Sequence, residues 1–112
     1  MKCIALLTLL ALIVGPALAA DPEAGLAAIQ ELGRVNGQAL ACSQMAVSSQ
    51  AKKLMIQHSP KTRRYGEVFE EATNAAYLEQ GKEQDRCPKP MGFSARLSEL
   101  SERLQATLPA AQ

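Results

Sequence analysis

A short apolar run at the start of the chain places the strongest limit on what the remaining residues can fold into. Residues 4–14 are apolar apart from one threonine, and Lys2 provides a positive charge before them. Residues that break a helix and small side chains come next: Gly15, Pro16, Ala17 and Ala19. This order is typical of a secretory signal peptide. We therefore predict that residues 1–20 are a leader, with cleavage after Ala19 or Ala20.

The length of that run separates a leader from a membrane anchor. A helix that spans a bilayer needs about 20 apolar residues, and residues 4–14 fall well short of this. We therefore expect no transmembrane segment after cleavage. The mature chain, residues 21–112, has the size of one small domain, located in the periplasm or secreted. At this size the buried fraction of the surface is modest, so a covalent cross-link has a large effect on stability.

Two cysteines remain after cleavage, because Cys3 leaves with the leader. Cys42 and Cys87 are an even number in an exported chain, which predicts a disulfide between them. The chain-entropy model gives such a link about 4 kcal/mol of stabilisation for a loop of this length. The alternative is two separate buried thiols. Neither cysteine belongs to a Cys-x-x-Cys motif, so the sequence does not support thiol exchange chemistry.

Four stretches of the mature chain place apolar residues at the three- and four-residue spacing of a helix. They cover residues 22–32 or beyond, 38–58, a third stretch from about Pro60 or Thr62 to Gln80, and 94–108. Asp21-Pro22-Glu23 combines a capping residue, a first-turn proline and an acid, as helix starts do. Ser59-Pro60 ends the second stretch, because the residue before a proline disfavours helix. Gly81 is expected to end the third stretch in a left-handed conformation.

Gly33 and Gly37 leave the extent of the first helix open. Each glycine costs about 1 kcal/mol relative to alanine inside a helix. One interpretation is a turn or kink near Asn36-Gly37, which gives four helices. In the other, the helix continues and Gly33, Gly37 and Ala41 form a smooth groove for close packing of a neighbouring helix, which gives three.

The later helices have clear apolar stripes, separated by a loop. The third stretch has a predicted core stripe of Tyr65, Val68, Phe69, Ala72, Ala75 or Ala76, and Leu78. The last stretch opens at Ser94 and has a leucine stripe at Leu97, Leu100, Leu104 and Leu108. Between these stretches, residues 82–92 are polar and interrupted by prolines, which predicts a loop pinned at Cys87. The tail, residues 109–112, is expected to fray.

These stretches together predict the fold class. No segment alternates between apolar and polar residues, and aromatic residues make up only 4% of the chain, so strands are not expected. We predict an all-α fold, a small three- or four-helix up-down bundle with one disulfide. In this arrangement the disulfide ties the second helix to the loop before the last one.

Residues that could carry catalysis are scarce. His58 is the only histidine, which excludes most hydrolytic triads and zinc sites. We expect no catalytic residues, no cofactor and no metal site. A weak alternative uses Met55 and His58, three residues apart, as copper ligands or as an axial pair for haem. A bundle that carries a small ligand needs a cavity among Met45, Leu54, Met55 and Phe69.

The charge distribution is more informative than the total. Because Lys2 leaves with the leader, the 12 basic side chains of the whole sequence become 11, equal to the 11 acidic ones. A neutral protein has no strong general attraction to nucleic acid, so none is expected as a partner. Basic residues nevertheless gather in a segment without acids: Lys52, Lys53, Lys61, Arg63 and Arg64. We predict that they form a patch for an acidic protein surface or an anionic envelope component.

We therefore expect a non-enzymatic interaction module, such as an inhibitor, an adaptor or a chaperone-like envelope protein. Such a protein needs only a stable scaffold and an exposed surface. The alternative is a binder of a small ligand, copper or haem that uses the interior of the bundle.

Overall fold

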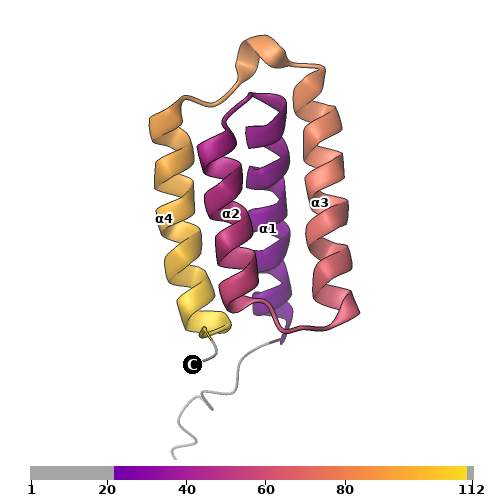
Figure 1. Cartoon of the computed structure of the whole chain (residues 1–112), viewed down its shortest axis with the longest axis vertical. Helices are drawn as coiled ribbons and strands as arrows, with labels where there is room; N and C mark the ends of the chain where they lie inside the picture. Colours follow the sequence, from indigo (N-terminus) through magenta and orange to yellow (C-terminus); the bar gives the residue numbers. More distant parts are fainter. Residues whose placement is uncertain (1–21, 111–112) are drawn as a thin grey trace, which may run out of the picture.

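The computed structural model describes residues 22–110, and over this range the chain forms four α-helices and no strand. They are α1 (Pro22–Ala41), α2 (Met45–His58), α3 (Arg63–Gly81) and α4 (Pro90–Thr107), with a short 3-10 helix, η1 (Gln84–Arg86), before α4. The helices run alternately up and down (Figure 1). The prediction of an all-α up-down bundle is confirmed, in its four-helix form. The predicted leader, residues 1–20, lies outside the described residues.

The aliphatic core lies among α1, α2 and α4. Helix α1 packs against all three other helices, and α2 also packs against α4. The leucine stripe of α4 is buried as predicted, and Phe93 extends it by one turn. The largest fully buried apolar side chains come from α1 and α4: Phe93, Ile29, Leu32, Leu104 and Val35. Helix α1 is therefore the central helix of the bundle, and α4 supplies much of the side-chain volume around it.

Helix α3 packs against α1 in a different way, because small residues bring the two backbones close together. A Cβ atom placed on Gly33 would lie 2.6 Å from the carbonyl oxygen of Phe69 and 2.8 Å from the Cβ of Ala72. A Cβ on Gly37 would lie 2.9 Å from the Cβ of Ala76 and would overlap a backbone oxygen of α3. We call Gly33, Gly37, Ala72 and Ala76 the glycine seam. Both glycines thus lie inside a continuous α1, and a side chain at either position has no room.

The break between the first two helices lies after Ala41, and not near Asn36-Gly37. Ser43 adopts a left-handed conformation with φ of 58°. The amide of Gln44 donates to the carbonyl of Ala39 at 2.8 Å, and that of Ser43 donates to Leu40 at 3.3 Å. This pair of bonds is a Schellman motif, which commonly has glycine at the left-handed position. The second helix therefore begins at Met45 and not at residue 38, and the bundle has four helices although neither glycine breaks α1.

Three other predictions on the helices are corrected by the structure. Gly81 is the last residue of α3 and is not left-handed, because the chain continues through Lys82 in right-handed geometry. Helix α4 begins at Pro90 and not at Ser94, since a proline suits the first turn of a helix. Leu78 is 64% exposed and is not a core residue. Leu78 is two residues from the buried Ala76 and Gln80, about 200° around the helix, so it lies on the side of α3 that faces away from α1.

Figure 1 shows which connections share an end of the bundle. The α1–α2 turn and the α3–α4 loop lie at one end, at the top of the view, and the α2–α3 turn lies at the other. Across residues 22–110, no helix is both long enough and apolar enough to cross a bilayer. Of the predicted frayed tail, Pro109 and Ala110 are exposed and the last two residues lie outside the described range.

Candidate interaction surfaces

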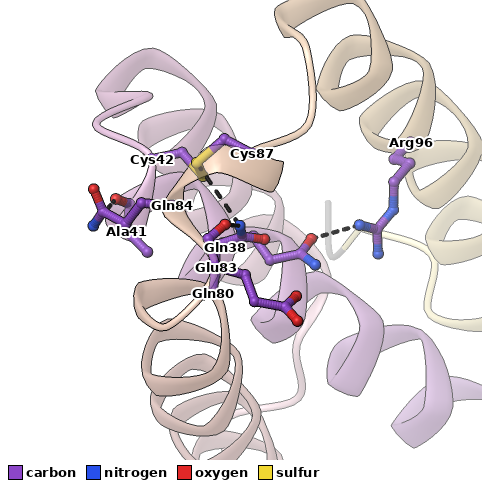
Figure 2. The surroundings of a disulfide bond; sticks show 8 residues. All are labelled: Gln38, Ala41, Cys42, Gln80, Glu83, Gln84, Cys87 and Arg96. Atoms are coloured by element: carbon purple, nitrogen blue, oxygen red, sulfur yellow. Dashed lines mark hydrogen bonds between the residues drawn. A yellow bond between two sulfur atoms is a disulfide. The ribbon is translucent and has the colours of Figure 1, made fainter.

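The disulfide joins the two connections at the upper end of the bundle. Cys42 and Cys87 are linked, with their Cα atoms 5.8 Å apart (Figure 2). Cys42 lies in the α1–α2 turn, so the link ties that turn, and not the second helix itself, to the α3–α4 loop. The two cysteines are 45 positions apart in sequence. The disulfide therefore fixes the end of α3 to the end of α1, on which α3 packs.

Glutamine side chains hold the backbone around the disulfide. The Nε2 atom of Gln80 donates to the carbonyl of Glu83 at 2.8 Å and lies 3.8 Å from the Sγ of Cys87 (Figure 2). The Nε2 atom of Gln84 donates to the carbonyl of Ala41 at 3.4 Å. These bonds satisfy backbone oxygens in a connection without regular structure. The disulfide and these hydrogen bonds therefore hold the α1–α2 turn and the α3–α4 loop together.

The five basic residues of the predicted patch are exposed, and four of them line four different grooves. They lie on two helices and the turn between them: Lys52, Lys53, Lys61, Arg63 and Arg64. Lys53 lines a groove between α2 and α4, whereas Lys52 lines a groove between α2 and α3. Arg64 lines a third groove, between α1 and α3. Lys61, Arg63 and Arg64 belong to the α2–α3 turn and the first turn of α3, at the lower end of the bundle, whereas Lys52 and Lys53 lie further up α2 and line different grooves.

The start of α3 carries two exposed arginines, Arg63 and Arg64. Thr62 occupies the N-cap position, and its side chain makes no capping hydrogen bond. The first turn of α3 contains no acidic residue. The ion pair that the structure shows among the described residues joins Arg96 to Glu31 at 3.3 Å, on another part of the bundle, and the acidic Glu23 of α1 lines the same groove as Arg64. We call Lys61, Arg63 and Arg64 the basic turn.

Met55 and His58, the weak metal alternative, both contribute to packing. Met55 is partly buried against the core, and His58 is 8% exposed. The Nδ1 atom of His58 lies 2.7 Å from the carbonyl oxygen of Leu108 and donates to it. This contact holds the end of α4 against the end of α2. Over residues 22–110, no three His, Cys, Asp or Glu side chains are grouped so that they could hold a metal ion.

The residues named for a ligand cavity lie in different places. Met45 is 58% exposed at the start of α2. Leu54 lines the groove between α2 and α4, and Phe69 lines the one between α2 and α3. These grooves lie on the surface between helices, and they do not bring the four residues together.

A buried polar network links three helices, and the sequence analysis did not find it. The Oγ of Ser48 donates to the Oδ1 of Asn36 at 2.6 Å, and the Nδ2 of Asn36 donates to the Oγ1 of Thr73 at 3.3 Å. Thr73 in turn donates to the carbonyl of Gly33 at 3.2 Å. The sequence pattern suggested only that Asn36 lies at a turn or kink. Its position seven residues after Ile29, on the apolar face of α1, is the signal that could have placed it in the interior.

No family model, no curated protein and no solved structure matches this chain. Functional arguments therefore depend on its own geometry and charge.

Proposed function

We propose that this protein is an exported, non-enzymatic interaction module whose basic turn binds an anionic component of the cell envelope. One observation carries the proposal: Lys61, Arg63 and Arg64 lie at the start of α3 with no acid in its first turn and no side-chain cap. The two arginines and the lysine are all exposed. Their positive charges therefore add to the positive end of the helix dipole.

Without a bound anion, this arrangement of charges lowers the stability of α3. A helix N-terminus favours negative charge, by about 0.3–1 kcal/mol per charge at an exposed position. Two arginines in the first turn oppose this preference, as does the missing cap, which is typically worth about 1 kcal/mol. A bound anion would satisfy the free amides and the cationic side chains together. The N-terminus of α3 is thus less stable than a capped one, and a bound phosphate or carboxylate group would restore the lost stability.

The chemistry of the side chains supports the same class of ligand. Arginine presents a planar set of donors that matches phosphate and carboxylate groups, and lysine adds a compact positive charge. The disulfide supports export, because such bonds persist in oxidising compartments. The proposal needs no catalytic group, and the only histidine is engaged with Leu108.

The test compares charge reversals at the two ends of the bundle. The double variant Lys61→Glu/Arg63→Glu reverses two charges of the basic turn and leaves Arg64 in its groove. The matched control, Lys82→Glu/Lys89→Glu, makes the same change in charge at exposed positions near the disulfide. Binding is measured by co-sedimentation with vesicles of anionic phosphatidylglycerol and of neutral phosphatidylcholine, and by capture of anionic material from an envelope extract.

We expect the native protein and the control to bind anionic vesicles or anionic extract material at low salt. Binding should weaken as salt rises, because exposed charges are screened within about 10 Å at 0.1 M. The basic-turn variant should not bind. Equal behaviour of the two variants, or no salt-sensitive binding by the native protein in either assay, would contradict the proposal.

A further inference from the structure

A small apolar groove lies at the lower end of the bundle, where the end of α2 meets the end of α4 (Figure 1). Its volume is about 380 Å3, and its walls include Ile56, Pro60, Leu108 and Pro109. Leu108 is buried, whereas Ile56 is 68% exposed, Pro109 is exposed and Pro60 is half-buried. We call Ile56, Pro60 and Pro109 the apolar tip. These three side chains remain in contact with solvent after the chain has folded.

Two lysines lie beside the apolar tip. Lys61 lines the same groove, and its Nζ atom donates to the carbonyl oxygen of Ile56 at 3.1 Å. An ammonium group has three donors, so its other two can reach a ligand. Lys53 precedes Ile56 by three residues, which makes the two side chains neighbours on the surface of α2. Positive charge therefore adjoins Ile56 both along α2 and in the α2–α3 turn.

The acidic residues of the described part of the chain lie elsewhere. None of the nine residues that line the groove of the apolar tip is acidic, and none of those that line the groove of Lys53 is. The other bases differ, because Glu23 lines the groove of Arg64 and Glu70 lines that of Lys52. We therefore assign only Lys53 and Lys61 to the surface around the apolar tip.

The combination of an exposed apolar side chain and long cationic ones is typical of proteins that bind at a membrane surface. The apolar group enters the boundary of the acyl chains, and the lysines extend to the level of the headgroups. A free phosphate ion would engage the lysines alone and leave Ile56 in water. A specific protein interface usually involves about 20–30 residues on each side, whereas nine residues line this groove. An anionic phospholipid surface therefore fits these side chains best.

We propose that the apolar tip inserts into the acyl-chain boundary of an anionic phospholipid membrane, while Lys53 and Lys61 bind phosphate groups at its surface. This inference rests on the proposed function, because it names a phospholipid surface as the anionic envelope component. The lower end of the bundle then contacts the membrane, and the disulfide end points away from it. Each lysine near an anionic surface strengthens binding by about fivefold. Two lysines and one exposed isoleucine therefore give reversible binding.

The first test uses a fluorescent reporter, because the chain contains no tryptophan. Ile56→Trp places a single indole at the apolar tip. The matched control is Leu78→Trp, at a position that is 64% exposed near the upper end of α3. The oxidised chain, purified in its exported form, is mixed with phosphatidylglycerol vesicles, with and without bromine on the acyl chains. We expect the emission of Ile56→Trp to shift to shorter wavelength and to be quenched by bromine, and that of Leu78→Trp to stay unchanged.

The second test measures binding after removal of the apolar group. Ile56→Gln and its control Leu78→Gln are compared with the native chain by co-sedimentation with the same vesicles, and circular dichroism checks that each variant folds. We expect Ile56→Gln to bind about five- to tenfold more weakly, since full burial of an isoleucine corresponds to tenfold or more. This factor should persist as salt rises, because transfer of an apolar group is not screened, whereas binding of every variant falls. Leu78→Gln should match the native chain.

The inference and the proposed function fail in different ways. The inference is overturned if Ile56→Gln binds vesicles as well as the native chain does, or if both tryptophans report the same change. It is also overturned if the native chain captures an acidic protein from the extract and binds no vesicle. In these cases the proposed function still stands if Lys61→Glu/Arg63→Glu abolishes binding. A native chain that binds neither vesicles nor extract material contradicts both.

Discussion

The two sides of α1 are buried by opposite means. Towards α4, large side chains such as Phe93 and Leu104 fill the space beside Ile29 and Leu32, and all four are completely inaccessible. Towards α3, the glycine seam removes side chains so that the helix backbones approach each other closely. Helix α1 is thus covered by large side chains on the side of α4 and by close backbone contact on the side of α3.

This difference determines how firmly each neighbour is held. Burial of apolar area contributes roughly 25 cal/mol per Å2, so the large side chains of α4 give most of the hydrophobic stabilisation. The glycine seam buries little side-chain area, and its contribution comes from close contacts and from the Thr73 bond to the carbonyl of Gly33. Helix α3 has only Ala72, Ala76 and Gln80 buried, and the disulfide fixes the loop that follows it. We therefore expect substitutions on the two sides of α1 to lower the free energy of unfolding for opposite reasons. A smaller side chain leaves a void on the side of α4, and a larger one pushes the helices apart on the side of α3.

The largest effect is expected on the α4 side. Phe93→Ala removes a fully buried ring from the core, and such changes cost about 3–5 kcal/mol through lost burial and the cavity that remains. Urea unfolding followed by circular dichroism measures the loss. Met91→Ala, two residues away and 84% exposed, is the control and should change stability by less than about 0.5 kcal/mol. A small effect of Phe93→Ala would show that α4 contributes less than its buried side chains indicate.

On the α3 side, adding a single methyl group should destabilise the protein. Gly37→Ala brings a Cβ into contact with Ala76 and the backbone of α3, so the helices must separate. Overpacking of this kind costs about 1–3 kcal/mol, and a gain of about 1 kcal/mol in helix propensity offsets part of it. We expect a net loss of up to about 2 kcal/mol in the free energy of unfolding.

The same substitution in open space should have the opposite sign. Gly66 lies in α3 with no atom within 4 Å of an added Cβ, so Gly66→Ala should stabilise by up to about 1 kcal/mol through helix propensity alone. Both variants are measured by urea unfolding. Stabilisation by Gly37→Ala as well would mean that α1 and α3 are not in close contact.

The smallest effect concerns the polar network that lies between the two sides. Ser48→Ala removes the donor to the Oδ1 of Asn36, and both residues are at most 2% exposed. An unsatisfied buried acceptor costs about 1–3 kcal/mol, and the higher helix propensity of alanine reduces the net loss to about 1 kcal/mol. The neighbouring exposed Ser49→Ala should be neutral or slightly stabilising. If the two serine variants have the same unfolding midpoint, the network does not stabilise the bundle.

The helices themselves could be predicted where local signals agree. The leucine stripe of α4 and the end of α2 before Ser59-Pro60 follow from spacing and from proline chemistry. The turn after α1 could not be predicted in the same way, because Ser43 occupies a left-handed position where glycine is common, whereas the glycines of α1 lie inside the helix. Pro90 has a similar ambiguity, since proline can interrupt a helix or begin one.

For the candidate surfaces, the sequence identified the basic residues but not their grouping. Lys52 and Lys53 are adjacent in sequence, yet successive residues of a helix point about 100° apart, so the two lysines line different grooves. The groove between α1 and α3 could not be predicted, because its walls come from segments about 40 residues apart.

The sequence alone determined the helical periodicity and the pair of cysteines, Cys42 and Cys87, that follows the predicted leader, because these are local patterns that can be read along one segment. Only the tertiary structure decided that Gly33 and Gly37 face α3, that Asn36 joins a buried network, and that Arg64 and Glu71 share a groove. These features depend on which helix packs against which. That choice is made by the whole set of contacts at once, and no single stretch of sequence contains it.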